Sequence, residues 1–315
     1  MDNKFCIGVD IGGTKISFVL INRAGDVLAS HRLPTNADDG EETVFKQVAT
    51  GIQHLQVSTD KSIEGIGVGC PGRLNPHTGI VYKATNMYWE NVNLREGIAQ
   101  NLQHKCPIYI HQDANAQAVG EYFYGVAKDV SNFVMMTIGT GFGGAAILDG
   151  QLVIGHSFNS MEIGHMPLDV NGRLCVCGMR GCPEMYISGV GLQAGAQELL
   201  PQFPDSQLHQ VTPLTTPTIL DAFHQGDALA IQLIDEMNDW LSTMCIICMS
   251  MLNPSLFVIG GGLGDALFDV IQQHLPQKLA HLNREIHVPV PIKQSQLADS
   301  AIGAAALVWH HTENH

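Results

Sequence analysis

The first part of the chain combines short apolar runs with one longer amphipathic segment. Residues 4–12, 16–22 and 27–33 are rich in β-branched residues and are separated by glycine-containing turns. This pattern predicts three successive strands. Residues 41–57 instead carry apolar side chains three or four positions apart, which predicts an amphipathic helix. Further patterns predict the order strand, helix, strand, helix over residues 63–72, 94–103, 106–112 and 113–125.

The same arrangement starts again in the second part of the chain. Residues 132–155 predict a strand, a glycine loop, a strand, an Asp-Gly turn and a third strand. The patterns that follow predict helices at 186–200 and 227–252, a strand at 255–262, a helix from about 264, a strand at 288–293 and a helix at 300–311. Because strands alternate with helices and each part begins with the same unit, we expect a mixed α/β fold with an internal duplication.

Composition narrows the class of protein. The chain has 315 residues, of which 45% are hydrophobic and 15% charged, so a substantial packed core is expected. The formal net charge is −14 and no basic run occurs, which argues against nucleic acid as the main partner. The first residues lack the features of a signal peptide, and the most apolar helical stretch, residues 240–252, is too short to span a bilayer. We therefore expect a cytoplasmic protein without a membrane partner, whose thiols stay reduced.

Three glycine-rich loops follow predicted strands. Glycine lets backbone N–H groups approach an anion closely, and threonine and lysine side chains add further donors. A single loop of this kind is also typical of an ordinary tight turn, but three at strand ends indicate a site for phosphate groups or a polar ring system. The candidate residues are Asp10, Gly12, Gly13, Thr14 and Lys15 in the first loop, Thr140 and Gly141 in the second, and Gly261 and Gly262 in the third.

The second loop also matches another known motif. Gly139, Gly141 and Gly144 have the G-x-G-x-x-G spacing of dinucleotide-binding proteins, and Glu162 lies near the expected acidic position. That motif must open a helix, whereas the residues after these glycines have β character on both sides of an Asp-Gly turn. A dehydrogenase is therefore disfavoured.

Three of the eight cysteines lie within eight positions of one another. They are Cys175, Cys177 and Cys182, and His165 lies ten residues before the first of them. One histidine and three cysteines form a complete tetrahedral ligand set for zinc, with no position left for a catalytic water. A redox pair typically has the spacing C-x-x-C, and a nucleophile does not need three thiols. The spacing therefore favours a structural Zn²⁺ site over a coincidental group of buried cysteines.

Three acidic residues accompany these features. Glu162 precedes His165 by three positions and Glu184 follows Cys182 by two, so zinc would hold both carboxylates and the imidazole together. Such a rigid polar group suits the hydroxyls of a sugar, whereas the alternative is that both glutamates are ordinary surface residues. Asp113 lies where a predicted strand ends and a helix begins, which is compatible with a helix cap or with a general base.

Together these segments resemble the ROK family (repressors, open reading frames, sugar kinases) over essentially the whole chain. The motifs occur in the family's order as DIGGTK, GVGCPG, DANAQAVGE, GTGFGG, EIGH, CVCGMRGCPE and NPSLFVIGGG. The resemblance implies the actin-like ATPase (ribonuclease H-like) fold, with two α/β lobes around a cleft. We expect an N-terminal lobe of residues 1–115, completed by the C-terminal helix at about 298–315, and a C-terminal lobe of residues 116–297 that carries the zinc loop. The resemblance further implies phosphorylation of a hexose by ATP with Mg²⁺, and a homodimer.

The resemblance also implies roles for individual residues. Asp113 matches the general base that deprotonates the sugar 6-hydroxyl. The first two glycine loops match the phosphate-binding loops, with Asp10 near Mg²⁺, and the third matches the adenosine site. The residues implied to bind the sugar are Gly72, Asn86, Gln112, Glu162, His165 and Glu184, and those implied to hold zinc are His165, Cys175, Cys177 and Cys182.

Two departures from the family pattern bear on the substrate. Gln112 stands where family kinases usually have a sugar-contacting asparagine. Residues 155–165 lack the Gly- and Ala-rich lead-in typical of glucokinases and resemble N-acetylglucosamine and N-acetylmannosamine kinases, and residues 72–81 resemble the latter. We therefore expect an N-acetylhexosamine as the substrate, with glucose as the alternative.

The family also contains sugar-responsive transcriptional repressors, which are the non-enzyme alternative. Those proteins carry an N-terminal helix-turn-helix before the first glycine loop. In this sequence the first strand is expected to begin at about residue 4, and the negative net charge opposes DNA binding. A kinase is therefore the favoured function.

Overall fold

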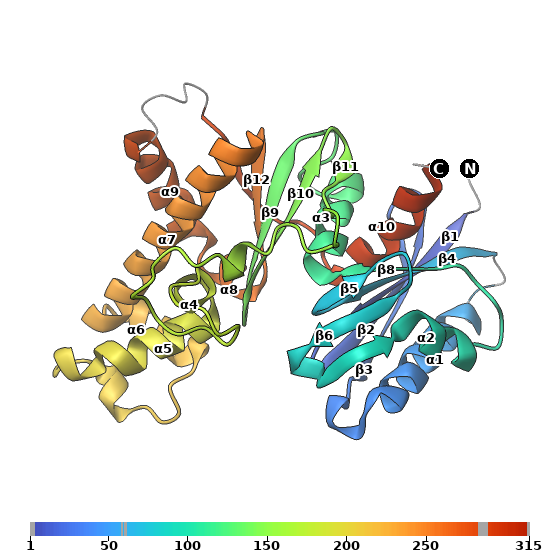
Figure 1. Cartoon of the computed structure of the whole chain (residues 1–315), viewed down its shortest axis with the longest axis horizontal. Coiled ribbons are helices and arrows are strands. Elements are labelled where there is room, and N and C mark those ends of the chain that lie inside the picture. The colour runs from blue at the N-terminus through green and yellow to red at the C-terminus, as the bar shows by residue number, and fades with distance from the viewer. Residues whose placement is uncertain (1–3, 58, 60–61, 283–288, 314–315) are drawn as a thin grey trace. The chain divides into compact units, whose positions relative to one another are not determined.

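The chain forms two compact units, each built around its own sheet (Figure 1). The computed structural model describes residues 4–57, 59, 62–282 and 289–313. The first unit contains Met1–Ser131, Ala145–Ser160 and Ser295–His315, and the second contains Asn132–Gly144 and Met161–Gln294. The boundary expected at residue 115 falls inside α3 (Asp113–Tyr124), a helix that belongs wholly to the first unit.

The first unit is built on a five-stranded sheet with the strand order β3-β2-β1-β4-β8. Its strands are β1 (Phe5–Ile11), β2 (Lys15–Asn22), β3 (Val27–Pro34), β4 (Ile63–Cys70) and β8 (Ile108–Gln112). The pairs β1–β2 and β2–β3 are antiparallel, whereas β4 runs parallel to both β1 and β8. The carboxyl ends of three strands therefore meet at one edge, where Asp10 lies opposite Gly69 and Cys70 lies opposite Gln112.

Helices cover both faces of this sheet. On one face lie α1 (Glu41–Val57) and α2 (Leu94–Asn101), and on the other lie α3 and α10 (Ser300–Glu313) (Figure 1). The amphipathic pattern predicted for residues 41–57 is confirmed, because α1 buries the side chains that have helical spacing. These buried side chains include Val44, Val48, Ile52 and Leu55.

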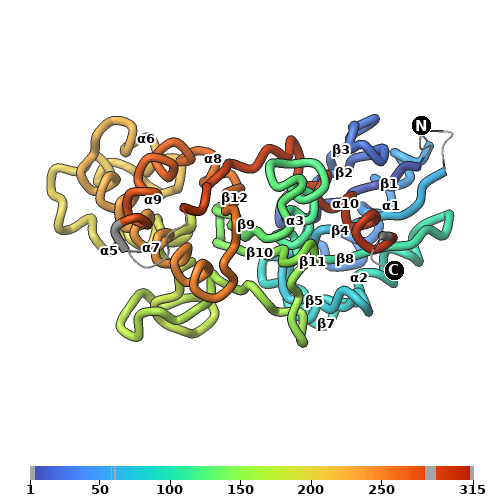
Figure 2. The backbone as a smooth tube through the Cα atoms, turned by 90° about the horizontal axis from the view of Figure 1, so that it is seen from above, coloured from blue at the N-terminus to red at the C-terminus, as the bar shows by residue number. Residues whose placement is uncertain are grey.

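The C-terminal helix α10 lies directly on the strands because both partners are made of small residues. A Cβ atom on Gly8 or on Gly67 would lie within 1.9 Å of a carbonyl oxygen of α10. Figure 2 shows α10 beside α3, where a Cβ atom on Gly120 would lie 2.5 Å from the Cα atom of Gly303. The Ala- and Gly-rich sequence of α10 therefore allows the end of the chain to pack on the sheet formed by its beginning.

A small antiparallel sheet with the order β5-β6-β7 completes the first unit. Its strands are β5 (Arg73–Asn75), β6 (Ile80–Ala84) and β7 (Trp89–Asn93), and the 3-10 helix η2 (Thr85–Met87) joins the last two. The buried Trp89 ring lies 6.2 Å from the Phe45 ring of α1, measured between ring centres. The segment around η2 is therefore anchored to the core of the unit.

A buried histidine makes the first unit sensitive to acid. His111 lies on β8, with its ring centre 5.7 Å from that of His311 on α10. The pKa of His111 is lowered to about 3, mainly by burial and in addition by the positive charges of His311, His310, His77 and Arg95. In the unfolded chain this pKa is about 6.5, so the unfolded state binds the proton first and stability falls as the pH drops below about 6.5.

We expect the substitution His111→Asn to remove this part of the pH dependence. Between pH 7 and pH 4.5 the wild-type protein should lose about 2 to 3 kcal/mol more unfolding free energy than the variant, since each pH unit below 6.5 costs up to about 1.4 kcal/mol. Urea unfolding of both proteins at the two pH values measures this difference. Equal losses would show that the protonation of His111 does not control acid stability.

The second unit contains most of a second five-stranded sheet, with the order β11-β10-β9-β12-β13. Its strands are β9 (Phe133–Ile138), β10 (Phe142–Leu148), β11 (Gln151–Leu152), β12 (Leu256–Gly260) and β13 (Ile292–Gln294). β12 runs parallel to β9 and β13, and β10 is antiparallel to β11. A strand, β10, follows the glycines of the second loop, so the predicted hairpin is confirmed and the helix required by the dinucleotide motif does not form there.

Helices make up most of the rest of the second unit. The helix expected over residues 186–200 is split at Ser188, whose side chain caps the second piece by accepting a hydrogen bond from the Gly191 N–H group. No described helix is both long and apolar enough to cross a membrane. The helices of this unit are α4 (Glu184–Ile187), α5 (Gly189–Leu199), α6 (Thr216–His224), α7 (Ala228–Leu252), α8 (Gly262–Ala266) and α9 (Phe268–Leu282), and its 3-10 helices are η3 (Ile163–His165), η4 (Leu200–Gln202) and η5 (Gln207–Gln210). The first unit has a further 3-10 helix, η1 (Ala37–Asp39).

Candidate active site and metal centre

Two aspartates of the first unit lie side by side at the carboxyl edge of its sheet. Asp10 is near the end of β1, and Asp113 directly follows β8. Gly69 lies between them on β4, because a Cβ atom there would be 3.2 Å from Asp10 Oδ1 and 3.8 Å from Asp113 Cα. Because Gly69 has no side chain, there is space at this edge of the sheet for both aspartates.

The Asp10 carboxyl group is held in one orientation. Ser300, the first residue of α10, donates a hydrogen bond of 2.5 Å from its hydroxyl to Asp10 Oδ2. Burial raises the pKa of Asp10 to about 6, the bond from Ser300 opposes this rise, and the negative charge of Asp113 adds to it. At neutral pH the group is therefore mainly ionised and fixed by α10, a partner that no local sequence pattern indicates.

Asp113 occupies the first turn of α3 with an exposed side chain. The helix-cap role considered for it is wrong, because Gln112 occupies the cap position and its side chain makes no capping bond there. Asp113 Oδ1 instead accepts a hydrogen bond of 2.8 Å from the N–H group of Ala114. A carboxylate in this position is stabilised by the helix dipole and stays accessible to a ligand. Gln112 Oε1 accepts a bond of 3.4 Å from Asn115, which orients the amide.

The first glycine loop forms the tight turn between β1 and β2. The N–H group of Gly12 donates to the carbonyl oxygen of Lys15 at 2.9 Å, and the Thr35 hydroxyl donates to the carbonyl oxygen of Gly12 at 2.6 Å. Thr14 and Lys15 are exposed. A Cβ atom on Gly13 would lie 3.6 Å from Asn86 Nδ2. The first glycine loop therefore lies next to η2. This 3-10 helix carries Asn86, one of the residues predicted to bind the sugar.

Gly72 is required where β4 leads into β5. Its φ angle is +90°, which side-chain-bearing residues rarely adopt, and a Cβ atom there would lie 2.3 Å from the carbonyl oxygen of Lys83. The GVGCPG motif therefore ends in a residue whose backbone must touch β6. This contact sets the start of the small sheet relative to β4.

In the second unit, three segments meet at the start of β10. The N–H group of Phe142 donates to Glu184 Oε2 at 3.3 Å, and a Cβ atom on Gly141 would lie 2.8 Å from the same oxygen. A Cβ atom on Gly164, in η3, would lie 2.1 Å from the carbonyl oxygen of Phe142. The second glycine loop, the segment from Glu162 to His165 and the first turn of α4 are thus in contact.

Replacing Gly164 by alanine should displace the segment that carries Glu162 and His165. The added methyl group would overlap the Phe142 carbonyl oxygen, so the η3 backbone has to move. A shift of about 1 Å at a binding site can reduce activity by on the order of 100-fold. Steady-state kinetics and thermal unfolding measure the effect. A sugar KM and a melting temperature equal to those of the wild type would show that this contact does not position the segment.

The third glycine loop lies at the same edge of its sheet as the second. Gly260 of β12 pairs with Thr137 of β9, so the loops that follow both strands are neighbours. Gly261 has a φ angle of +86°, and a Cβ atom on it would lie 2.5 Å from the Ile138 carbonyl oxygen. Gly262 begins α8. The backbone at Gly261 therefore packs closely on β9, whereas a Cβ atom on Gly262 would meet nothing within 4 Å.

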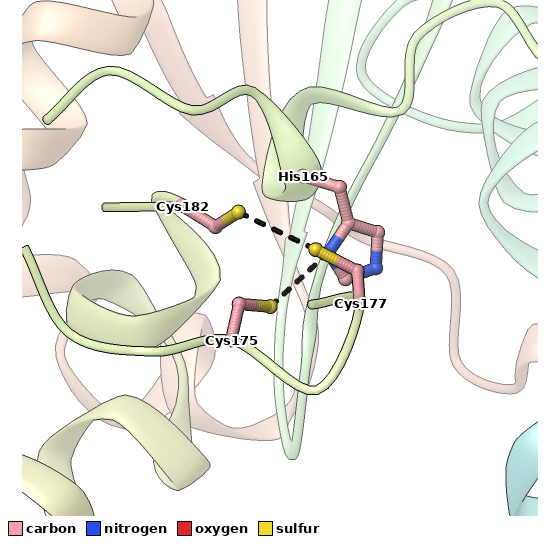
Figure 3. Close-up of side chains that lie close together, drawn as sticks. All are labelled: His165, Cys175, Cys177 and Cys182. Carbon is pink, nitrogen blue, oxygen red and sulfur yellow. Dashed lines mark hydrogen bonds between the residues drawn. The ribbon is translucent and has the colours of Figure 1, made fainter. Parts of the chain in front are cut away.

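The four predicted zinc ligands meet at one point (Figure 3). Their ligand atoms all lie within 4.8 Å of one another. Cys175 Sγ is 3.6 Å from His165 Nδ1, and Cys177 Sγ is 3.6 Å from Cys182 Sγ. Tetrahedral zinc with bonds of about 2.0 to 2.3 Å requires ligand atoms about 3.3 to 3.8 Å apart. The donor set and these spacings therefore fit a zinc ion.

The chain folds tightly around this cluster. The N–H group of Cys175 donates to Met179 O at 2.8 Å, and that of Gly178 donates to Cys175 O at 2.9 Å. Gly178 and Gly181 both have positive φ angles, and a Cβ atom on Gly181 would lie 2.0 Å from Asp169 O. Cys182 is fully buried and lies just before α4. The sequence C-x-C-G-x-x-G-C therefore supplies both the sulfur atoms and the turns that bring them together.

Arg173 forms a second support for this loop that the sequence did not reveal. Its guanidinium group donates to Glu198 at 2.7 Å and to Glu236 at 2.9 Å. The same group lies over the ring of Tyr186, which stacks on Trp240 with ring centres 4.0 Å apart. These partners lie 13 to 67 positions away in the sequence, so no local motif could have identified them.

The comparisons with known proteins fit this architecture. Each unit begins with a strand–glycine turn–strand hairpin, and two carboxylates lie at strand ends of the first unit. This arrangement and the similarity to solved structures place the chain in the actin-like ATPase fold class. The family model for "ROK family" matches residues 6–311. The chain therefore belongs to the ROK family.

The relatives include proteins named glucokinase and N-acetyl-D-glucosamine kinase. The chain is 32% identical over 287 residues to the glucokinase of Halalkalibacterium halodurans, covering 87% of this chain and 86% of the relative. It is 28% identical over 316 residues to the N-acetyl-D-glucosamine kinase of Haemophilus influenzae, covering 95% and 98%. The ROK family glucokinase from Streptomyces griseus, crystallised in complex with glucose and AMPPNP, has a TM-score of 0.81 at 28% identity, covering 97% of this chain and 99% of that one. The predicted family and fold are confirmed, and the roles of single site residues stay predictions.

Proposed function

We propose that this protein is an ATP-dependent sugar kinase that phosphorylates the 6-hydroxyl of a hexose, most favourably an N-acetylhexosamine. The observation that carries the proposal is the exposed Asp113 carboxylate at the start of α3, beside the partly buried Asp10. Membership of a family whose relatives include glucokinases and an N-acetylglucosamine kinase supports the choice of a sugar as acceptor.

In the proposed reaction, Asp113 acts as the general base. Its carboxylate accepts the proton of the sugar 6-hydroxyl as the oxygen attacks the γ-phosphorus of ATP. The bond between that phosphorus and the β–γ bridging oxygen breaks, and ADP leaves. The products are ADP and a sugar 6-phosphate. Asp113 lies in the first turn of α3 with an exposed side chain, so the carboxylate is accessible to the sugar.

The glycine loops would bind the nucleotide. We assign phosphate contacts to Gly12, Gly13, Thr14 and Lys15 in the first loop and to Thr140 and Gly141 in the second loop, and adenosine contacts to Gly261 and Gly262 in the third. Mg²⁺ would neutralise part of the phosphate charge when bound, and Asp10 is the ionised carboxylate at the first loop that suits it. Ser300 would then orient Asp10 toward this task.

We assign the binding of the sugar hydroxyls to Asn86, Gln112, the backbone at Gly72, Glu162, His165 and Glu184. His165 points Nδ1 at the cysteine sulfurs, so its other ring nitrogen is the one that can bond a hydroxyl. We propose that His165, Cys175, Cys177 and Cys182 hold a structural Zn²⁺ ion, which would keep this imidazole in place. We further propose a homodimer without a nucleic-acid or membrane partner.

A comparison of four sugars tests the substrate. The values of kcat/KM for glucose, mannose, N-acetylglucosamine and N-acetylmannosamine are measured with ATP and Mg²⁺. We expect one of the N-acetylhexosamines to give the highest value, in line with the sequence of residues 155–165. An equal or higher value for glucose would make the protein a glucokinase, and the absence of turnover with all four would contradict the kinase itself.

A further inference from the structure

Three bulky residues of the described chain have a strained backbone. They are Tyr88, Phe158 and Met161, with φ angles of 56°, 62° and 61°. Side chains with a Cβ atom rarely adopt this left-handed conformation, and for a bulky residue it is unfavourable. The other described non-glycine residues with positive φ are all of the two types that tolerate it, namely Asn36, Asn91, Asp129, Asp149 and Asn253.

The three strained residues all lie next to residues that we assign to sugar binding. Tyr88 follows Asn86 by two positions, and Phe158 and Met161 lie just before Glu162. Strained residues of this kind persist where the surrounding structure enforces them, and they cluster at ligand sites. The strain is therefore not scattered over the fold but concentrated beside the proposed substrate.

Packing within the protein accounts for Phe158 but not for Tyr88. The Phe158 ring lies edge-on to the His77 ring, with ring centres 5.2 Å apart. The Tyr88 residue is 78% exposed, so its ring gains little from the rest of the unit. Tyr88 is the residue that ends η2, a position where the left-handed conformation is common but is usually taken by glycine or asparagine. Here a bulky aromatic residue takes it and leaves its ring exposed.

The backbone on both sides of Tyr88 is fixed. Met87 and Trp89 are buried, and Trp89 pairs with Ala84 in the small sheet. The N–H group of Tyr88 donates to the Thr85 carbonyl oxygen at 3.3 Å. The ring is therefore attached to a rigid support, and its segment is the one whose Asn86 side chain lies against the first glycine loop. An exposed aromatic ring on a rigid support is a preorganised contact for a ligand.

We propose that Tyr88 is a substrate-binding residue whose ring packs on the apolar C–H face of the bound sugar. The inference rests on the proposed sugar-kinase function and adds a contact that the polar residues cannot supply. Asn86, Gln112 and the carboxylates bind hydroxyls at the rim of a pyranose, whereas its faces carry C–H groups. An aromatic ring supplies a large, rigid apolar surface with only two rotatable side-chain bonds.

The substitution Tyr88→Asn separates binding from stability. Asparagine tolerates the left-handed conformation, so the variant should melt at the wild-type temperature or about 2 °C above it. The KM for the best sugar should rise on the order of tenfold, and the KM for ATP should not change. Tyr88→Phe keeps the ring and should retain the wild-type sugar KM. The matched control is Tyr82→Asn, which removes a second exposed tyrosine from β6 and should leave the sugar KM unchanged.

The outcomes distinguish this inference from the function on which it rests. A wild-type sugar KM in Tyr88→Asn would overturn the role of Tyr88. A rise in the KM for ATP as well as for the sugar, together with a lower melting temperature, would also overturn it, because it would indicate general damage to the fold. A changed oligomeric state with an unchanged sugar KM would assign the ring to a subunit contact instead. If the wild type binds a sugar calorimetrically but does not phosphorylate it, the kinase proposal fails, and the Kd of the same variants still decides the role of Tyr88. If it binds none of the four sugars, both proposals fail.

Discussion

The substitution Asp113→Asn is expected to lower kcat by about 10²- to 10⁴-fold, the usual contribution of a general base. Asparagine keeps the shape of the side chain and its place at the start of α3, but it cannot accept the proton of the sugar hydroxyl. Because the ground-state contacts to the sugar are assigned to other residues, the Kd for the sugar should stay close to that of the wild type. Calorimetric titration with the sugar and a coupled assay for ADP measure the two quantities separately.

An exposed aspartate on a helix that carries none of the proposed site residues provides the control. Asp235 lies on the exposed side of α7, so Asp235→Asn makes the same chemical change without touching the proposed site. Its kcat should equal that of the wild type. Near-normal turnover in Asp113→Asn would show that another group accepts the proton, and the base assignment would then be wrong.

Loss of one zinc ligand should have the second large effect. In Cys182→Ser the fully buried thiolate is lost, and the zinc content should fall from one ion per chain toward zero. Since Glu184 follows Cys182 by two positions and contacts the start of β10, we expect the sugar KM to rise about 10- to 100-fold. The melting temperature should fall as well. Elemental analysis, thermal unfolding and steady-state kinetics check these three results.

A cysteine outside the cluster is the matched control for this experiment. Cys106 is half-buried in the first unit, and its sulfur contacts the carbonyl oxygen of Ile63. Cys106→Ser should keep one zinc ion per chain and the wild-type sugar KM. Stoichiometric zinc in Cys182→Ser, or no zinc in wild-type protein purified without chelators, would contradict the metal site.

Local patterns in the sequence predicted much of the fold, because the two units are built from regular periodic elements. Glycines at strand ends indicated the hairpins, and the β character after Gly144 correctly excluded the dinucleotide motif. The spacing of His165 and the three cysteines was sufficient to predict the cluster. The cysteines are so close in sequence that one short loop can bring their sulfur atoms together without any distant partner. The small-residue helix at 300–311 was also predicted, although its position on Gly8 and Gly67 was not.

The sequence failed where a residue depends on partners that are distant along the chain. Ser300 contacts Asp10 across 290 positions, and Arg173 contacts Glu236 across 63, so no window of sequence contains both partners. The alternative in which Asp113 caps α3 was wrong because the strand β8 ends at Gln112, which takes the cap position itself. Backbone strain is likewise set by tertiary structure, and Tyr88 therefore gave no signal in the sequence.

Analysis of the reaction product tests the central proposal most directly. Purified protein is incubated with ATP, Mg²⁺ and the best of the four sugars, and the products are examined by ³¹P and ¹H NMR. The account predicts one ADP for each sugar phosphate formed, with the phosphorus coupled to the two protons on C6. Release of inorganic phosphate without a sugar phosphate, or phosphorylation of a different hydroxyl, would contradict it.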